Sequence, residues 1–535
     1  MSKMTDYHCT LRWKGYVVSK EKLTNEEKSI IKKDCWVKPL SFNPFQPKGS
    51  LFTRDTGYPI YQESPNYFIL PRYYGLRTFG VPRENKIPIG QSISIQCHAK
   101  TLSHQKKAWK VLKKTFSPRQ IHQSSMGGGN GGILSIPCGY GKTVLAIRTI
   151  ARLGKRTLIV VNKEDLLYQW EEELKTFTNA KIGLIQGPTV NVDDCDVVLG
   201  MLKSLSERDY DTSMLKSFGF LIIDEAHHIA ARTFCQCILR IRPRFTLGLS
   251  ATPQRRDGLG YLLHEFLGPM LYQEKRDGKN TVMVKGIQLV NPSHKAYKDV
   301  YFQSYSSQRV RNSNQMENNL CECPDRTRCL IQIISTLVKQ PKRKILVLGK
   351  RRHHLQILKD NLDGLLGTSY STGFYWGMGK GKKGGKRAHR QMLEESKHCD
   401  IILGTVNIAK EALNIKALNT LVFVSNFGSD LDGLDQAVGR ILRVFHKEVS
   451  PLVVDIYDKV GNFVTHYRQR CQKYYKPMKY PLYQHTVTFD TQQNYEKQAL
   501  QEFLDTNETH IKEEKRKSQD MEKKEDMDMS KCYLD

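Results

Sequence analysis

Short β-rich runs alternate with helical segments along this 535-residue chain, and the alternation occurs twice. We predict strands at residues 133–136, 157–161, 196–199, 221–223 and 246–249, and again at 345–348, 401–404, 421–424 and 452–455. Strands that alternate with helices favour right-handed crossovers and a parallel sheet covered on both faces. The sequence therefore predicts an α/β fold with two similar parallel-sheet lobes, whose ligands collect at the carboxyl ends of the strands.

The composition changes at both ends of this repeated pattern. Residues 1–85 are rich in aromatic side chains and proline, which indicates a small N-terminal accessory domain. We assign residues 86–280 to the first lobe and 281–480 to the second. Residues 481–535 are charged and poor in core residues, so we predict a tail that is a solvated helix or has no fixed structure.

The net charge of +29 favours a polyanionic partner, and binding through phosphates would depend strongly on salt. No apolar run approaches the ~20 residues that span a bilayer, and the first residues have no signal-peptide core. We therefore expect a soluble intracellular protein with no membrane partner. Thirteen cysteines, an odd number, predict reduced thiols. Cys321, Cys323 and Cys329 lack paired zinc-site spacing, which argues against a metal there.

A phosphate-loop motif follows the predicted strand 133–136 and precedes an apolar helical segment. Its residues are Pro137, Cys138, Gly139, Tyr140, Gly141, Lys142 and Thr143. In this setting backbone amides and the helix N-terminus cradle phosphates, Lys142 reaches the β and γ groups, and the Thr143 hydroxyl binds Mg²⁺. A chance Gly-Lys-Thr turn is the alternative. The neighbouring glycine run 127–132 is predicted to be a flexible surface loop before the strand.

Two acids, Asp224 and Glu225, close the apolar run 218–223, and Ala226 and His227 follow. An aspartate at a strand end can hold Mg²⁺, and the adjacent glutamate can activate a water that attacks a γ-phosphate. The first turn of an ordinary helix, where the dipole favours acids, is the alternative for this tetrad. His227 fits better as a link to a moving lobe than as a catalyst.

Two further segments have an open interpretation. Ser250 and Thr252 stand at another strand end and could sense the γ-phosphate, or could cap the strand. Gln436, Arg440 and Arg443 are spaced to share one side of a helix. Such arginines form either a solvated basic face or, if the lobes close on nucleotide, an arginine finger that contributes ~10³–10⁵ in rate.

The ordered set of these four motifs resembles the superfamily-two helicases of the DEAH type. The Pro-Cys-Gly-x-Gly-Lys loop and segment 252–258 are similar to the XPB and UvsW-like branch, and segment 70–75 resembles helicases of large nucleocytoplasmic DNA viruses. The resemblance implies two tandem RecA-like lobes over residues 98–458, with ATP as substrate and Mg²⁺ as metal. It also implies that Gln105 reads adenine. Segment 161–163 with Trp170 resembles a strand-holding motif, although core packing is the alternative for Trp170. Segments 404–405 and 411–415 resemble a motif that couples nucleotide to nucleic acid.

The resemblance implies an ATP-dependent helicase or translocase in viral transcription, replication or repair. DNA is the expected substrate, RNA is the alternative, and no motif reads bases, so recognition should be largely independent of sequence. The glycine- and lysine-rich segment 377–387 either contacts the nucleic-acid backbone or is only a soluble loop. A translocase that does not separate strands, and a nucleotide-gated binding scaffold, are the other two function classes. Contacts with transcription or replication machinery, and location in the host cell and virion, would follow from a viral origin.

Overall fold

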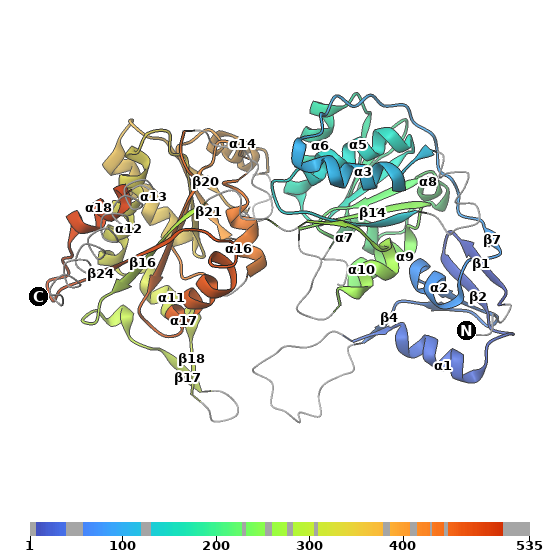
Figure 1. Ribbon diagram of the computed structural model, residues 1–535, viewed down its shortest axis with the longest axis horizontal. Coiled ribbons are helices and arrows are strands. Elements are labelled where there is room, and N and C mark those ends of the chain that lie inside the picture. Colours follow the sequence, from blue (N-terminus) through green and yellow to red (C-terminus); the bar gives the residue numbers. More distant parts are fainter. Residues whose placement is uncertain are drawn as a thin grey trace, which may run out of the picture. The chain divides into compact units, whose positions relative to one another are not determined.

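The computed structural model describes residues 7–38, 57–118, 130–226, 232–251, 259–274, 276, 282–303, 309–377, 386–406, 415–428, 431–442 and 448–506. Contacts divide the chain into two compact units, unit 1 at Met1–Arg276 and unit 2 at Asp277–Asp535. Figure 1 shows a central sheet in each unit. Each unit is described below by itself.

The central sheet of unit 1 has eight strands, and only the edge strand β11 runs antiparallel to its neighbour. Their order is β11 (Thr189–Asn191), β10 (Ile182–Gln186), β12 (Val197–Met201), β9 (Thr157–Val161), β13 (Phe220–Ile223), β14 (Phe245–Ser250), β8 (Gly131–Ser135) and β15 (Met270–Gln273). The sequence-predicted strands are confirmed with ends shifted by one or two residues. Gly131 and Gly132 were wrongly assigned to a loop. They lie inside β8, where a Cβ on Gly132 would meet Pro269 O at 2.5 Å.

Helices cover both faces of this sheet because both faces of its strands are apolar. In β9, Leu158 and Val160 belong to one buried cluster, and Ile159 and Val161 belong to another. The second cluster includes side chains of α3 (Lys106–Thr115), α5 (Lys142–Leu153) and α6 (Glu164–Phe177). The first includes side chains of α7 (Leu202–Glu207), α8 (Thr212–Lys216), α9 (Arg232–Arg240) and α10 (Tyr261–Leu267). This two-sided burial is what a parallel sheet requires.

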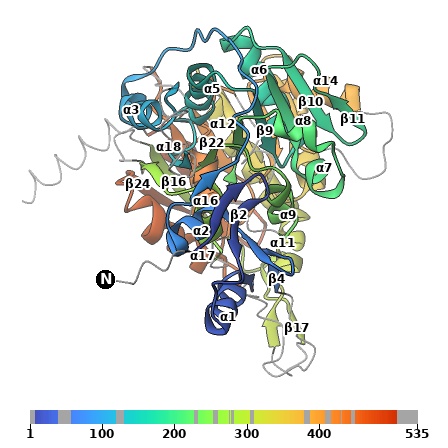
Figure 2. The same cartoon turned by 90° about the vertical axis from the view of Figure 1, so that its right-hand side faces the viewer.

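A smaller sheet precedes the central one in unit 1 and faces the viewer in Figure 2. Its order is β5 (Gln62–Glu63), β6 (Tyr67–Leu70), β2 (Gly15–Ser19), β1 (Cys9–Arg12) and β7 (Glu84–Asn85). The remaining elements of this segment are α1 (Asn25–Asp34), α2 (Arg72–Phe79) and the two-stranded sheet of β3 (Trp36–Val37) and β4 (Tyr58–Pro59).

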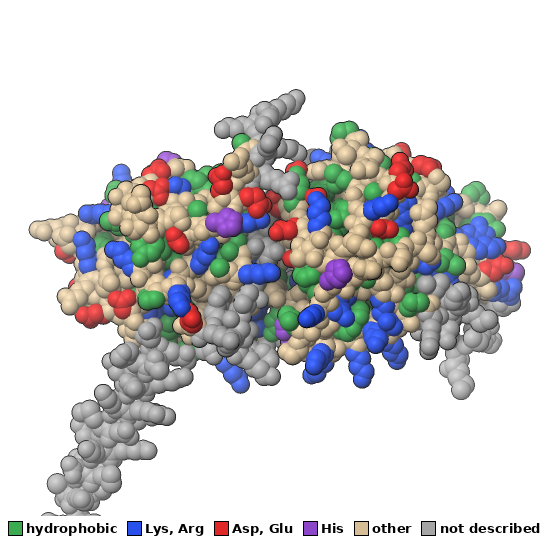
Figure 3. All heavy atoms as spheres, turned by 90° about the horizontal axis from the view of Figure 1, so that it is seen from above, with side chains coloured by type: hydrophobic (Ala, Val, Ile, Leu, Met, Phe, Trp, Pro, Cys, Tyr) green, Lys and Arg blue, Asp and Glu red, His purple; other side chains and the backbone are tan. Residues whose placement is uncertain are grey.

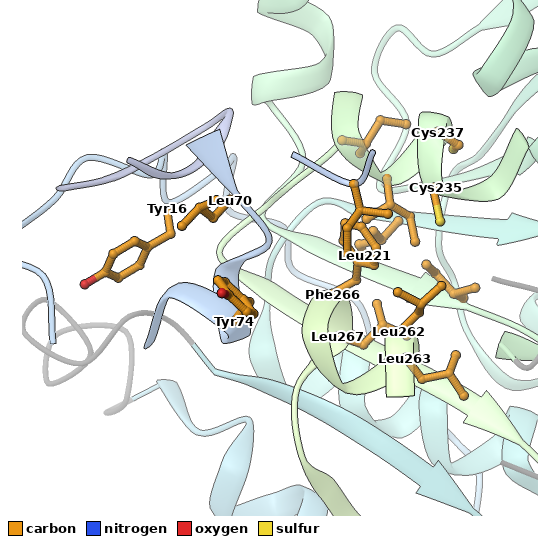
Figure 4. Packing of buried hydrophobic residues seen from close by; sticks show 14 of the residues in the cluster. Tyr16, Leu70, Tyr74, Leu221, Cys235, Cys237, Leu262, Leu263, Phe266 and Leu267 are labelled. Carbon is orange, nitrogen blue, oxygen red and sulfur yellow. The ribbon is translucent and has the colours of Figure 1, made fainter. Parts of the chain in front are cut away.

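This N-terminal sheet shares a hydrophobic core with the central sheet. Tyr16, Leu70 and Tyr74 lie in the same buried cluster as Cys235 and Phe266, as Figure 4 shows. The buried Arg72 guanidinium donates to the backbone oxygens of Arg242, Pro243 and Arg244. The accessory segment is therefore packed into unit 1.

The sheet of unit 2 has seven strands, and all its pairings are parallel. Their order is β20 (Thr372–Tyr375), β21 (Ile401–Thr405), β19 (Ile345–Gly349), β22 (Thr420–Phe423), β23 (Leu452–Asp458), β16 (Met283–Val290) and β24 (Leu482–Thr488). One face is covered chiefly by α11 (Ser313–Cys321), α12 (Pro324–Lys339), α13 (Arg352–Leu366) and α18 (Lys497–Asp505). The other cluster holds side chains of α14 (Lys386–Ser396), α16 (Leu431–Val438) and α17 (Phe463–Arg470).

The boundary predicted for the charged tail is wrong by about 25 residues. β24 pairs with β16, and α18 buries Leu500 and Leu504. The Lys285 ammonium on β16 donates to the carbonyls of Phe503, Leu504 and Thr506 at the end of α18. The core of unit 2 therefore includes residues of the segment 482–506. The segment 511–524, on which the tail prediction also rested, lies outside the described residues.

Candidate ATP and nucleic-acid sites

The phosphate-loop motif lies between β8 and α5. Gly139 and Gly141 have φ values of +85° and +80°, which side chains other than glycine rarely adopt. Gly141 is the N-cap of α5, so the first turn of this helix and its free amides follow the loop directly. This geometry fits phosphates at a helix N-terminus.

Gln105 lies against this loop from the preceding segment. It ends the short helix η1 (Ser103–Gln105) and is 3% exposed. Its amide nitrogen donates to Tyr140 O at 2.9 Å, and its oxygen accepts from Leu102 N at 3.0 Å. Both ends of the side chain therefore support the local fold. Its role as an adenine reader stays a prediction.

Lys142 and Arg276 direct positive charge at the same loop. Lys142 Nζ lies 3.5 Å from Ile136 O. Arg276 donates to Cys138 O at 3.1 Å, and its guanidinium lies 5.8 Å from the centre of the Tyr140 ring. No local sequence pattern indicates Arg276, because only the fold brings this distant residue to the loop. Thr143 is half-buried in the first turn of α5.

Asp224 and Glu225 follow β13 and are each 8% exposed. The Asp224 carboxylate accepts from the Trp170 indole N–H at 2.8 Å and from Glu225 N at 2.9 Å. Burial raises the pKa of Asp224 to about 6, and the neighbouring Glu225 adds to the rise, whereas the Trp170 bond and the Lys142 charge oppose it. Glu225 has a φ of +47°, outside a helical conformation. The two acids therefore do not begin an ordinary helix at this point.

Trp170 is a core residue, as its alternative interpretation held. It is 1% exposed, and its indole nitrogen holds Asp224. Stacking of Trp170 on a base is therefore contradicted. A buried tryptophan satisfies its N–H, and here the acceptor is a candidate metal ligand.

Three strand ends meet beside the phosphate loop. β14 pairs with β8 so that Ser250 lies opposite Ser135, and Ser250 O accepts from Ile136 N at 3.2 Å. β13 pairs with β14 on the other side. The phosphate loop, the two acids and Ser250 therefore lie together at the carboxyl ends of the strands β8, β13 and β14, which we call the carboxyl edge of the sheet. His227 and Thr252 lie outside the described residues.

The donor set at this edge suits a magnesium ion. Thr143 supplies a hydroxyl and Asp224 a carboxylate, and oxygen ligands are those that Mg²⁺ prefers. The charge of Lys142 lowers the pKa of Asp224 against the effect of burial, which indicates that the loop and the acid lie near each other. A divalent cation would favour the ionised carboxylate further.

In unit 2 the motif of Gln436 and the arginines begins inside α16 and continues beyond its end. This helix ends at Val438, so Arg440 lies in the turn beyond it. Gln436 is 7% and Arg440 4% exposed, which contradicts a solvated basic face for Arg440. Gly404 and Thr405 end β21. Arg443, segment 411–414 and most of segment 377–387 lie outside the described residues.

A basic helix face in unit 1 was missed by the sequence analysis. α3 exposes five lysines, and among the described residues none is paired with a carboxylate. They are Lys106, Lys107, Lys110, Lys113 and Lys114. Figure 3 shows blue side chains projecting together from one edge of unit 1. The three- and four-residue spacing could have predicted this face, which fits a row of phosphates.

A second group with metal-ligand chemistry lies in unit 2. Ligand atoms of His294, Cys323 and Asp325 come within 4.8 Å of one another. His294 Nδ1 accepts from Ala296 N at 3.1 Å, and Asp325 accepts from Arg328. Hydrogen bonds therefore account for two of the three side chains. The cysteines within the described residues form no disulfide.

No helix in the described segments is both long enough and apolar enough to cross a bilayer. Residues 98–255 match the family model described as "Type III restriction enzyme, res subunit". The chain is 30% identical over 491 residues to a protein of Acanthamoeba polyphaga mimivirus named as an ATP-dependent RNA helicase, covering 90% of this chain and 88% of that one.

Shorter stretches are similar to other helicases. A helicase of Invertebrate iridescent virus 3 is 37% identical over 28% of this chain and 47% of its own length. A DNA 3'-5' translocase of the XPB type from Sulfurisphaera tokodaii is 30% identical over 27% and 32%. Among solved structures, yeast Dbp5 bound to RNA and ADP BeF3 aligns with a TM-score of 0.48 at 12% identity, over 72% of this chain and 94% of that one.

Proposed function

Since the chain belongs to the superfamily-two helicases of the viral and XPB type and is an ATP-hydrolysing enzyme, we propose that it uses ATP to move along nucleic acid and to separate strands. The expected substrates are DNA and DNA–RNA duplexes, in the transcription, replication or repair of a virus. The observation that carries this proposal is the edge of the unit 1 sheet where the phosphate loop, Asp224 and Glu225 meet.

The proposed chemistry follows from the position of each group. Amides of the loop from Cys138 to Gly141 and of the first turn of α5 bind the phosphates, and Lys142 neutralises their charge. Thr143 and Asp224 would hold Mg²⁺, which supplies charge stabilisation on the phosphate oxygens when bound. Glu225 accepts the proton of the attacking water.

Burial has two effects on the acid pair. The buried Trp170 indole donates a hydrogen bond that holds Asp224 in place. Burial also raises the free-energy cost of keeping both carboxylates ionised without a cation. The family resemblance implies that three side chains of unit 2 stabilise the negative charge on the transferred phosphoryl group. They are Gln436, Arg440 and Arg443. Gln105 holds the loop and is proposed to read adenine.

The first experiment measures ATP hydrolysis by the full chain with single-stranded and duplex DNA and RNA at several salt concentrations. Strand displacement is then measured on the substrate that stimulates hydrolysis most. Stimulated hydrolysis with strand displacement supports a helicase. Hydrolysis with movement but no displacement favours the second candidate, a translocase, which is how the Sulfurisphaera relative is named. Hydrolysis that no nucleic acid stimulates contradicts the proposal.

Glu225→Gln tests the assignment of the base. This variant keeps the shape of the side chain but cannot accept the proton, so turnover should fall by about 10²–10⁴-fold while ATP binding stays close to wild type. Steady-state hydrolysis and nucleotide titration measure the two effects. Glu172→Gln, at an exposed position of α6, is the control and should leave both unchanged. Full hydrolysis by Glu225→Gln would contradict the assignment.

A further inference from the structure

A cavity of about 230 Å³ in unit 1 lies away from the phosphate loop. It opens between the tip of the β1–β2 hairpin and the helices α7, α8 and α9. Apolar side chains of these helices form part of its lining. Pockets for drug-sized ligands usually measure about 300–1,000 Å³, so this cavity suits a single flat ring system whose substituents stay outside.

Two aromatic side chains from separate elements line the cavity. Trp13 stands at the hairpin tip, and Tyr210 lies between α7 and α8. Both are half-buried, so each ring has one side packed on the core and an exposed part. Tyr210 is fixed by a hydrogen bond from its hydroxyl to Ser204 O at 3.3 Å. Rings of this kind stack on nucleobases without regard to sequence.

Three cations surround the aromatic pair. Lys14, Arg208 and Arg240 line the cavity and are exposed at its rim. Arg240 lies 3.2 Å from the carboxylate of Asp209, which is almost fully exposed, so solvent screens this pair. Among the described residues, neither Lys14 nor Arg208 pairs with a carboxylate. The rim therefore has a net charge that favours an anion.

A buried side chain between α9 and β14 of unit 1 holds the tip of the β1–β2 hairpin in place. Arg242 is 4% exposed, and its guanidinium donates to the carbonyls of Lys14 and Leu70. Gly15 follows at a φ of +136°, and a Cβ there would collide with Arg242 and with Leu70 O. The position of Trp13 and Lys14 over the helices is thus fixed by the packing of the two sheets in unit 1.

We infer that this cavity binds one unstacked base of a single-stranded nucleic acid, with the adjoining phosphates on Lys14, Arg208 and Arg240. Aromatic side chains on which a base can stack, next to a rim of cations, are the combination by which proteins bind single strands. A duplex presents no free base face, so it should bind here only weakly. The inference rests on the proposed action on nucleic acid, and it adds a contact site remote from the ATP-binding edge.

The test uses the full chain without ATP and three probes: a dT12 oligonucleotide, the same length of duplex, and thymidine monophosphate. Binding of labelled oligonucleotide is followed by anisotropy, and tryptophan emission is recorded in parallel. Trp13→Ala should weaken dT12 binding about ten-fold or more, because it removes one stacking partner. Trp13→Phe keeps a ring, so it should bind close to wild type but lose the quenching that dT12 produces.

A second variant changes charges and leaves Trp13 in place, so that a folding defect at this half-buried residue cannot explain the result. Lys14→Gln with Arg208→Gln changes two exposed residues and should weaken dT12 binding and lower its salt dependence. The control, Lys203→Gln with Lys216→Gln, removes the same charge from exposed positions of α7 and α8 outside the cavity lining. Basal ATP hydrolysis should stay unchanged in both.

Two results would overturn the inference. One is equal dT12 affinity in the cavity variant and its control, together with quenching that persists in Trp13→Phe. The other is binding of thymidine monophosphate as tight as that of dT12, which would make this a site for free nucleotides. Because no ATP is present, a wild-type chain that fails to hydrolyse or unwind would contradict the proposed function without affecting these measurements.

Discussion

At the scale of single residues, Gly141 links the proposed phosphate loop to the helix α5 and lies against Gln105. Its left-handed φ of +80° turns the chain into α5, and a Cβ at this position would stand 2.2 Å from the Gln105 amide nitrogen. The loop therefore has no room for a side chain at Gly141, because it packs directly against Gln105. A side chain here would displace either Gln105 or the loop.

Gly141→Ala should therefore weaken ATP binding by about ten-fold or more, since a left-handed conformation alone costs about 1–2 kcal/mol in an alanine. Nucleotide titration measures the change. Gly187→Ala is the control, because Gly187 also has a positive φ, of +56°, but nothing lies within 4 Å of the added Cβ. If both variants bind ATP like wild type, the loop does not depend on this contact.

His354 of α13 is a buried residue that makes the free energy of unfolding depend on pH in the acidic range. It is 1% exposed, and neither ring nitrogen has a hydrogen-bond partner within the part of the chain that the structure describes. Burial lowers its pKa to about 3, and the charges of Arg326 and His353 act in the same direction. The unfolded chain thus binds a proton below about pH 6.5 that the folded chain does not bind. The free energy of unfolding should fall as the pH drops from 6.5 towards 3.

His354→Leu should remove this acid sensitivity, and at pH 5 its advantage over wild type should exceed that at pH 7.5 by up to about 2 kcal/mol. Urea unfolding at the two pH values gives the difference. His398→Gln, at an exposed position that does not contribute to the pKa of His354, should keep the wild-type pH dependence. The same pH dependence in His354→Leu would show that His354 is not the titrating group.

At the scale of the element, α3 combines two roles on opposite faces. Ala108 and Leu112 are buried in the core of unit 1, and the five lysines face outwards. Helical spacing produces both faces from one short sequence. Like charges crowded on one helix lower its stability, so an outer partner with negative charge would relieve the repulsion.

Replacing the five α3 lysines by glutamine should weaken nucleic-acid binding and reduce the salt slope by about 0.9 for each lost phosphate contact on duplex DNA. Anisotropy at several salt concentrations measures the slope. A control with the same charge change uses five exposed lysines of unit 2. They are Lys298, Lys339, Lys459, Lys473 and Lys476. Equal losses in the two variants would indicate a general charge effect and not a contact of α3.

At the scale of the whole molecule, the strand and helix after residue 481 complete the sheet and the core of unit 2. β24 covers the edge of β16, Val487 and Leu500 enter the core, and Lys285 satisfies the last carbonyls of α18. An open strand edge and an exposed apolar face would remain without this segment.

Truncation after Tyr480 should therefore lower the free energy of unfolding by about 3 kcal/mol or more, since loss of one buried leucine already costs about 2–5 kcal/mol. The full chain is the reference for this comparison. Urea unfolding followed by circular dichroism compares the two. Equal stability would mean that residues 482–506 are not part of the folded unit.

The sequence alone determined the two parallel sheets and the motif residues at their strand ends. Runs such as 157–161 and 452–455 are apolar on both faces, and only a doubly covered sheet buries both. The glycines of the phosphate loop and the acids after β13 were readable because their chemistry depends on local spacing. For the same reason the family resemblance could be stated from four short motifs.

Tertiary structure decided the features that depend on distant residues. The burial of Trp170 against Asp224, the return of Arg276 to the phosphate loop and the support of Tyr140 by Gln105 have no local signature. Residues 482–506 were assigned to the tail because an edge strand and a single amphipathic helix contain few apolar residues. Packing of the two sheets in unit 1 created the Trp13 cavity. Such contacts join residues far apart in the chain, and their energy depends on a geometry that no local pattern records.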